Sequence, residues 1–297
     1  ERNAAIWAAK EVANENDETR KKFELMCREV FKKFKACINV KGINLYIKEY
    51  GAVNIIYKSL QQDREQADIS EIMRQLHGIV DNVIETRTGG IKEEQKPLDI
   101  SKIDFERLKQ EFARSPSKYT SVQSLKYAIE QRLKRLLEQN PMRTDFQRHY
   151  EEIVAEYNRE KDRKTIEYYF EKLYKFVKTL NEEESRNIRE GLDKESLAMF
   201  DILKKNKLTP EEIKQVKKVA VDLLKTLKSR KLKVNNWRDK ESTRDAVRVV
   251  IKNFLWSDDT GLPPVYTESE IGVKLEDVFS HVYRAYPTVP SPYYAVV

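Results

Sequence analysis

Apolar residues recur at helical spacing along nearly the whole of this 297-residue chain. Phe23, Cys27 and Phe34 share one face of a helix, and lysines and arginines fill the positions between them. Successive stripes of this kind predict an all-α fold, a multi-helix bundle of about ten helices in one or two lobes. The predicted helices lie over about 4–13, 23–38, 45–60, 69–83, 99–114, 120–137, 146–157, 166–180, 197–203, 210–227, 237–256 and 267–286.

Residues at the ends of these stripes indicate where individual helices begin. Thr209 followed by Pro210 is a strong start, because Thr caps a helix and Pro suits its first position. Asp17 or Thr19 is expected to cap the first strongly patterned helix, and Thr120 a later one.

A break in the pattern separates two groups of helices. Residues 86–97 contain two adjacent glycines, a run of charges and a closing proline, which are typical of a long loop or a boundary. We therefore predict a helical portion over 1–88, a linker over 89–98 and a C-terminal helical domain over 99–297.

The composition favours helices with solvated outer faces. Gly and Pro number only 8 and 9, while charged residues make up 35% of the chain, which disfavours an all-β fold. The chain has no run of about 18 apolar residues, so no membrane partner is expected. Cys27 and Cys37, on one helix, are roughly 15 Å apart and too distant for a disulfide. We therefore expect a reducing, cytoplasmic location.

Short catalytic motifs are absent from the sequence. It contains no P-loop, GxGxxG, GxSxG or HExxH pattern. Two Glu-x-Lys matches, at 94–96 and 212–214, do not fall on strands as a nuclease site requires. His77, His149 and His281 have no Cys or His at metal-ligand spacing and are interpreted as structural. We therefore expect no catalytic residue, cofactor or metal in this chain.

Charge is the most uneven feature. The chain carries +7 overall, yet residues 204–256 hold 16 Lys and Arg against 6 Asp and Glu, a local charge of +10. Arg244, Arg248 and Lys252 are expected to form a stripe opposite the apolar face of their helix. Such a patch suits phosphate groups or an acidic protein, whereas the alternative is a solvated surface without a partner. The candidate residues are Lys214, Lys217, Lys218, Lys228, Arg230, Lys231, Arg238, Arg244, Arg248 and Lys252.

Several long stretches resemble the C-terminal part of the R subunit of type I restriction enzymes, and they occur in the same order. The stretches are FELMCREVFKKFKAC (23–37), ADISEIM (67–73), SKIDFERLKQEFARSPSKYTSVQSLKYAIEQRLKRLLEQNPMRTDFQRHYEEIVAEYN (101–158), NWRDKESTRDAVRVVIKNFL (236–255) and VFSHVY (278–283).

The resemblance implies a prokaryotic parent, an ATP-dependent type I site-specific deoxyribonuclease, with nuclease and motor domains preceding this region. ATP and Mg²⁺ would bind in those preceding parts, and this chain, which does not begin with Met, would be a non-enzymatic C-terminal fragment. The implied role is to dock the motor subunit onto the methyltransferase and specificity subunits. One alternative is nonspecific binding of duplex DNA near the motor by the basic segment 204–256. Another is a purely structural brace between motor and core.

Overall fold

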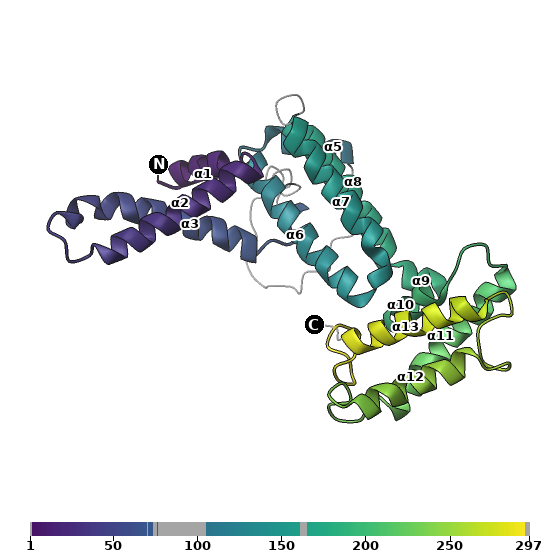
Figure 1. Ribbon diagram of the computed structural model, residues 1–297. Coiled ribbons are helices and arrows are strands. Elements are labelled where there is room, and N and C mark those ends of the chain that lie inside the picture. The colour runs from purple at the N-terminus through teal and green to yellow at the C-terminus, as the bar shows by residue number, and fades with distance from the viewer. Residues whose placement is uncertain (1, 70, 74–75, 77–104, 161–164, 295–297) are drawn as a thin grey trace, which may run out of the picture. The chain divides into compact units, whose positions relative to one another are not determined.

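The computed structural model describes residues 2–69, 71–73, 76, 105–160 and 165–294, and these residues form helices and connecting turns without any strand. The all-α prediction is confirmed (Figure 1). The α-helices are α1 (Arg2–Ala13), α2 (Asp17–Ala36), α3 (Ile47–Glu65), α5 (Phe105–Arg114), α6 (Lys118–Gln139), α7 (Thr144–Glu160), α8 (Ile166–Glu184), α9 (Arg186–Glu190), α10 (Lys194–Leu203), α11 (Pro210–Arg230), α12 (Glu241–Leu255) and α13 (Glu268–Ala285). Two 3-10 helices, η1 (Ile43–Tyr46) and η3 (Pro141–Arg143), precede α3 and α7.

The chain divides into two compact units. Unit 1 contains residues 1–132 and 149–179, and unit 2 contains residues 133–148 and 180–297. Helices α6, α7 and α8 each contribute residues to both units. The linker at 89–98 and most of the helix expected over 69–83 lie outside the described residues, so the division into 1–88 and 99–297 stays a prediction.

In unit 1, α2 and α3 pack side by side as a hairpin, with α1 in contact with both (Figure 1). Aromatic rings join the two arms of the hairpin: Tyr50 stacks on Phe34 with ring centroids 4.2 Å apart, and Phe31 meets Tyr57 edge-on. Nearer α1, the buried guanidinium of Arg20 donates to the Asn14 side chain and to a carbonyl of α3. These hydrogen bonds fix the end of the hairpin that lies next to α1.

The rest of unit 1 is built around α8, which packs against α5 and α7. Phe112 of α5 stacks on Phe170 with ring centroids 4.0 Å apart, and Tyr157 of α7 stacks on Tyr169 at the same separation. All four rings are buried. Stacked aromatic pairs of this kind contribute beyond the apolar area they bury.

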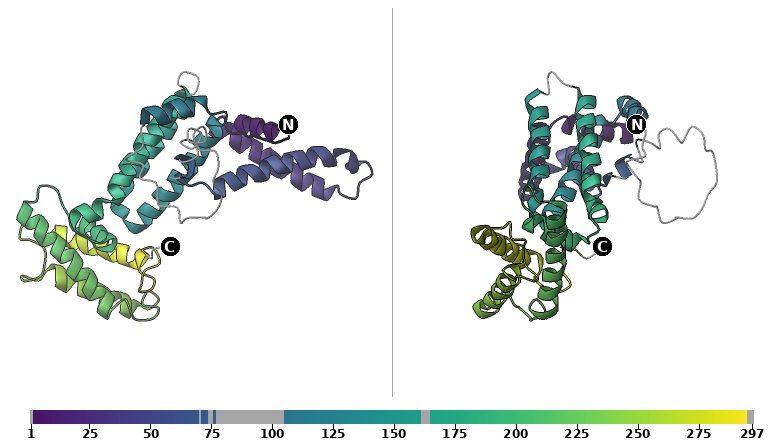
Figure 2. Two further views of the ribbon diagram at one scale, coloured as in Figure 1. Left: turned by 180° about the vertical axis from the view of Figure 1, so that it is seen from behind. Right: turned by 90° about the vertical axis from the view of Figure 1, so that its right-hand side faces the viewer.

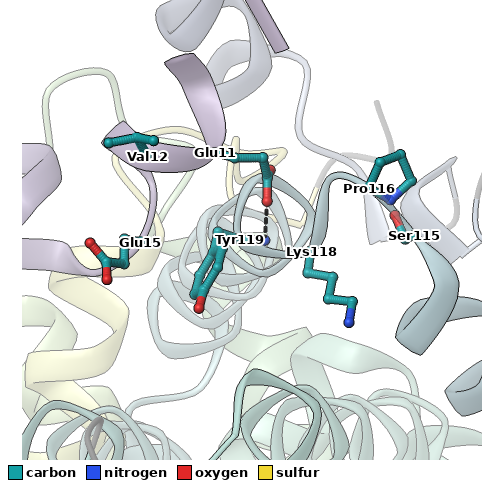
Figure 3. A pocket seen from close by; sticks show the side chains of 7 residues that line it. All are labelled: Glu11, Val12, Glu15, Ser115, Pro116, Lys118 and Tyr119. Carbon is teal, nitrogen blue, oxygen red and sulfur yellow. Dashed lines mark hydrogen bonds between the residues drawn. The ribbon is translucent and has the colours of Figure 1, made fainter. Parts of the chain in front are cut away.

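Two helix starts in unit 1 differ from the sequence-based expectation. Asn16, rather than Asp17 or Thr19, caps α2, because its side chain accepts from the Thr19 amide. Helix α6 begins at Lys118, before Thr120, and its first amides are capped by the carboxylate of Glu11 in α1 (Figure 3). Local sequence could not show this cap, because its two partners lie more than 100 residues apart.

Unit 2 encloses its own apolar core, formed mainly by α10, α11, α12 and α13 (Figure 2). Both expected helix starts are confirmed, since Thr209 and Thr267 each form a reciprocal capping box with the Glu three residues later. The helix expected from Trp237 begins only at Glu241. Trp237 instead lies buried in the preceding turn, where its indole N–H donates to the Tyr286 carbonyl at 2.9 Å.

Candidate functional site

The ten predicted site residues all lie in unit 2, on α11, on α12 and in the turn between them. The structure separates them into two groups. Five bind other groups of the same unit, and five point to solvent or have no polar partner among the described residues. The first group comprises Lys217, Lys228, Arg238, Arg244 and Arg248, and the second comprises Lys214, Lys218, Arg230, Lys231 and Lys252.

Two lysines of α11 are used to hold neighbouring helices. The Lys217 ammonium lies 2.7 Å from the Glu190 carboxylate at the end of α9, and it also donates to the Glu190 carbonyl at 3.0 Å. The hydrogen bond from Lys217 to the carboxylate, together with the Lys217 charge, holds the pKa of Glu190 below its ordinary value. Lys228 forms an ion pair with Glu195 of α10. These two charges are neutralised within unit 2 and contribute little to an external cationic surface.

Three arginines around α12 also have internal roles. Arg238 donates to the Tyr283 carbonyl at 3.1 Å, and Arg244 donates to the Arg238 carbonyl at 2.8 Å. Arg248 lies over the Phe279 ring at 3.8 Å. The expected stripe opposite the apolar face is therefore wrong for Arg244 and Arg248, which are half-buried. Four residues rotate about 40° past one full helical turn. Residues at i, i+4 and i+8 therefore point in progressively different directions around the helix.

Within the predicted basic segment, the outward face of α11 carries the lysines that are free of internal partners. Lys214, Lys218 and Lys225 are all exposed, and none has an ion-pair or hydrogen-bond partner among the described residues. They stand at i, i+4 and i+11, on one face of the helix and spanning roughly 16 Å. Lys225 was missed by the sequence analysis, although its spacing from Lys218 gives the signal. We call Lys214, Lys218 and Lys225 the α11 lysine row.

The other chemically reactive side chains have structural surroundings. His281 is buried in unit 2, and burial together with nearby Arg284 lowers its pKa to about 4. His149 stacks on Phe176 in unit 1, and His77 lies outside the described residues. Glu212, from one Glu-x-Lys match, accepts from the Thr209 amide in the capping box, while the match at 94–96 lies outside the described residues. Both cysteines are free.

A pocket of about 490 Å³ lies between α1 and the start of α6 (Figure 3). Its lining consists of Glu11, Val12, Glu15, Ser115, Pro116, Lys118 and Tyr119. The Glu11 carboxylate is already bound by the two amides at the start of α6. Across the described ranges, no group of three or more His, Cys, Asp or Glu side chains is placed to hold a metal ion. None of the helices in those ranges is long and apolar enough to cross a membrane.

Fold and surface together define an all-α protein whose candidate site is a cationic helix face. Residues 1–278 match the family described as "Type I restriction enzyme HindI endonuclease subunit-like, C-terminal". The chain belongs to this family, the C-terminal region of a type I restriction enzyme endonuclease subunit. No curated protein and no solved structure matches the chain.

Proposed function

We propose that this chain is an assembly module that docks the endonuclease subunit of a type I restriction enzyme onto its methyltransferase and specificity subunits. The observation that carries the proposal is the distribution of exposed apolar side chains. Of the 21 large hydrophobic residues exposed in the described ranges, nine lie between residues 25 and 55, on α2, η1 and α3 and in the turn between α2 and η1. Exposed apolar side chains concentrated in one part of a protein are typical of protein interaction sites.

Helix α2 illustrates why this surface needs a partner. Its side facing α3 holds the aromatic rings of the hairpin, while Leu25, Met26 and Val30 lie exposed elsewhere on the same helix. Helices in proteins are stabilised chiefly by burying apolar surface. A second protein that covered these three side chains would complete the packing of α2.

The docking proposal is tested by calorimetry with the purified 297-residue chain and the methyltransferase–specificity complex of the same restriction system. We expect saturable binding with a negative heat-capacity change, because apolar surface is buried. Absence of binding at tens of micromolar would contradict the proposal. The parent's activities as an ATP-dependent translocase and deoxyribonuclease belong to the same proposal and are assigned to parts outside this chain, where ATP and Mg²⁺ would bind.

The α11 lysine row supports a second candidate function, nonspecific binding of duplex DNA. Its three ammonium groups follow one line on α11, and none forms an ion pair among the described residues, although Glu211 and Asp222 stand three or four positions from members of the row. If each binds one phosphate, the logarithm of the binding constant should fall with the logarithm of salt concentration with a slope of about −2.7.

The DNA proposal is tested by fluorescence anisotropy on a labelled duplex across a salt series. The double variant Lys218→Glu, Lys225→Glu should weaken binding and flatten the slope. The double variant Lys22→Glu, Lys58→Glu, at two exposed positions of α2 and α3, serves as a charge-matched control. Arg244→Glu is a poor probe, because it also disrupts a turn. Binding that is insensitive to salt, or equal for both variants, would refute a role for the row.

A further inference from the structure

The end of the α2–α3 hairpin concentrates exposed apolar side chains in a short segment. We call residues 38–47 the hairpin tip; it follows α2, includes η1 and enters α3. It lies at the opposite end of the hairpin from the start of α2, where Asp17 contacts Lys126 of α6 (Figures 1 and 2). Its exposed apolar side chains are Ile38, Val40, Leu45, Tyr46 and Ile47. Solvent-facing loops are ordinarily polar, so this concentration is unusual.

The tip is nevertheless ordered by its own backbone. The amides of Val40, Ile43 and Leu45 donate to carbonyls three residues earlier, at 2.9, 3.2 and 3.1 Å. Gly42 adopts φ = +94°, a conformation that favours glycine. The apolar side chains are therefore presented on a fixed scaffold, so little ordering entropy would be lost when a partner covers them.

The surroundings of the tip are strongly basic. Residues 31–48 contain five lysines and no Asp or Glu. All five, Lys32, Lys33, Lys35, Lys41 and Lys48, are exposed. Lys33 forms only a long contact of 4.0 Å with Glu29. The tip thus combines an apolar centre with a cationic rim.

We propose that the hairpin tip binds a protein surface with an apolar centre and an acidic rim on the methyltransferase–specificity core. The inference rests on the docking function proposed above and names its contact site. Burial of Leu45 and Ile47 requires apolar partner surface, which a sugar-phosphate backbone does not supply. The lysine rim supplies electrostatic complementarity that selects an acidic partner and speeds association.

The test compares variants of the full 297-residue chain by calorimetry against the purified methyltransferase–specificity complex. Leu45→Ser with Ile47→Ser removes apolar contacts, and Lys41→Glu with Lys48→Glu reverses part of the rim. Ile188→Ser is the matched control, because Ile188 in unit 2 is 77% exposed and Leu45 is 78% exposed. Far-UV circular dichroism verifies that each variant keeps its helices.

We expect the apolar variant to bind at least about tenfold more weakly, which corresponds to about 1.4 kcal/mol. The rim variant should lose affinity mainly at low salt, and Ile188→Ser should bind as the unchanged chain does. If the unchanged chain binds and the tip variants bind equally well, the tip inference is overturned and the docking function stands. If the unchanged chain does not bind the complex, the tip inference and the proposed docking function are both overturned.

Two further probes distinguish an acidic protein from other anionic partners that the tip could bind. Vesicles of phosphatidylcholine and phosphatidylglycerol test a membrane surface, and a 30-base-pair duplex tests nucleic acid. The inference is overturned if the tip variants lose binding to either probe while their binding to the protein complex is unchanged. It is supported if only binding to the protein complex falls.

Discussion

The ion pair between Asp17 and Lys126 offers a sharp test of how unit 1 is held together. Asp17 lies in the first turn of α2, and its carboxylate binds the Lys126 ammonium and the Gln123 amide of α6. The Lys126 side chain is only 6% exposed, whereas that of Asp17 is 23% exposed. The two single variants should therefore differ in cost, although each removes the same pair.

Asp17→Asn leaves the buried ammonium of Lys126 without a counter-charge. Removing one partner of a buried pair costs about 3–5 kcal/mol, and we expect the lower end because Asn retains an acceptor oxygen. Lys126→Met leaves a carboxylate that is partly solvated and still bound by Gln123, so its cost should be nearer 1–2 kcal/mol. The double variant should be more stable than Asp17→Asn alone, because no buried charge remains.

Urea unfolding followed by far-UV circular dichroism measures all three variants. The reasoning is refuted if the two single variants cost the same and their costs add in the double variant.

The dependence of stability on pH provides a second measurement on the same pair. Burial raises the pKa of Asp17, but Lys126 and the hydrogen bonds outweigh burial and hold the pKa below its ordinary value of 3.8. The stabilisation is thus present above about pH 4 and is lost as the pH falls through the folded-state pKa; Asp17→Asn should remove this acid sensitivity.

Three further predictions concern single side chains. Glu11→Ala should lower the free energy of unfolding by about 1–2 kcal/mol, because α6 loses its cap, and Glu11→Gln by less; equal urea midpoints for both variants and the unchanged chain would contradict the capping role. Trp237→Phe should cost about 3 kcal/mol, since it leaves the Tyr286 carbonyl without its donor and opens space in the core; a loss below 1 kcal/mol in urea unfolding would count against this packing. The lowered pKa of His281, about 4 against an ordinary value near 6.5, means that the unfolded state binds more protons between these values. Unit 2 should therefore lose stability as the pH falls from about 6.5 to 4. His281→Asn should show a flatter pH dependence of its urea midpoint.

The helices could be predicted from sequence because their signals are local. The capping boxes at Thr209 and Thr267 lie within four residues of the chain, and apolar periodicity marks the buried face of α11 directly. The cap on α6 could not be found this way, because Glu11 reaches it from a distant helix. The start of α12 was placed too early because Trp237 resembles a core residue of the helix, whereas its indole is fixed by a carbonyl after α13.

The candidate site was predicted as a region but not as a set of side chains. Charge counting located the basic segment, yet it gave equal weight to Lys214, which is exposed, and to Lys217, which pairs with Glu190. Whether a lysine is exposed or paired depends on whether a neighbouring helix places a carboxylate next to it. The packing of the helices decides this, and the local sequence does not show it. The exposed tip of the α2–α3 hairpin was missed because an apolar stripe predicts a helix face without showing whether another element covers it.

The interleaving of the two units along the chain has a consequence for dissecting this protein by truncation. Residues 133–148 belong to unit 2 although unit 1 follows them. Within that stretch, Asn140 donates to Asp201 at 2.6 Å and Arg143 to Glu183 at 2.8 Å. A fragment beginning at residue 180 would leave both carboxylates without these donors. A fragment ending at residue 132 would lack the aromatic pairs that α8 makes with α5 and α7. Neither unit can be obtained as one uninterrupted stretch, so binding should be assigned by point substitution rather than by deletion.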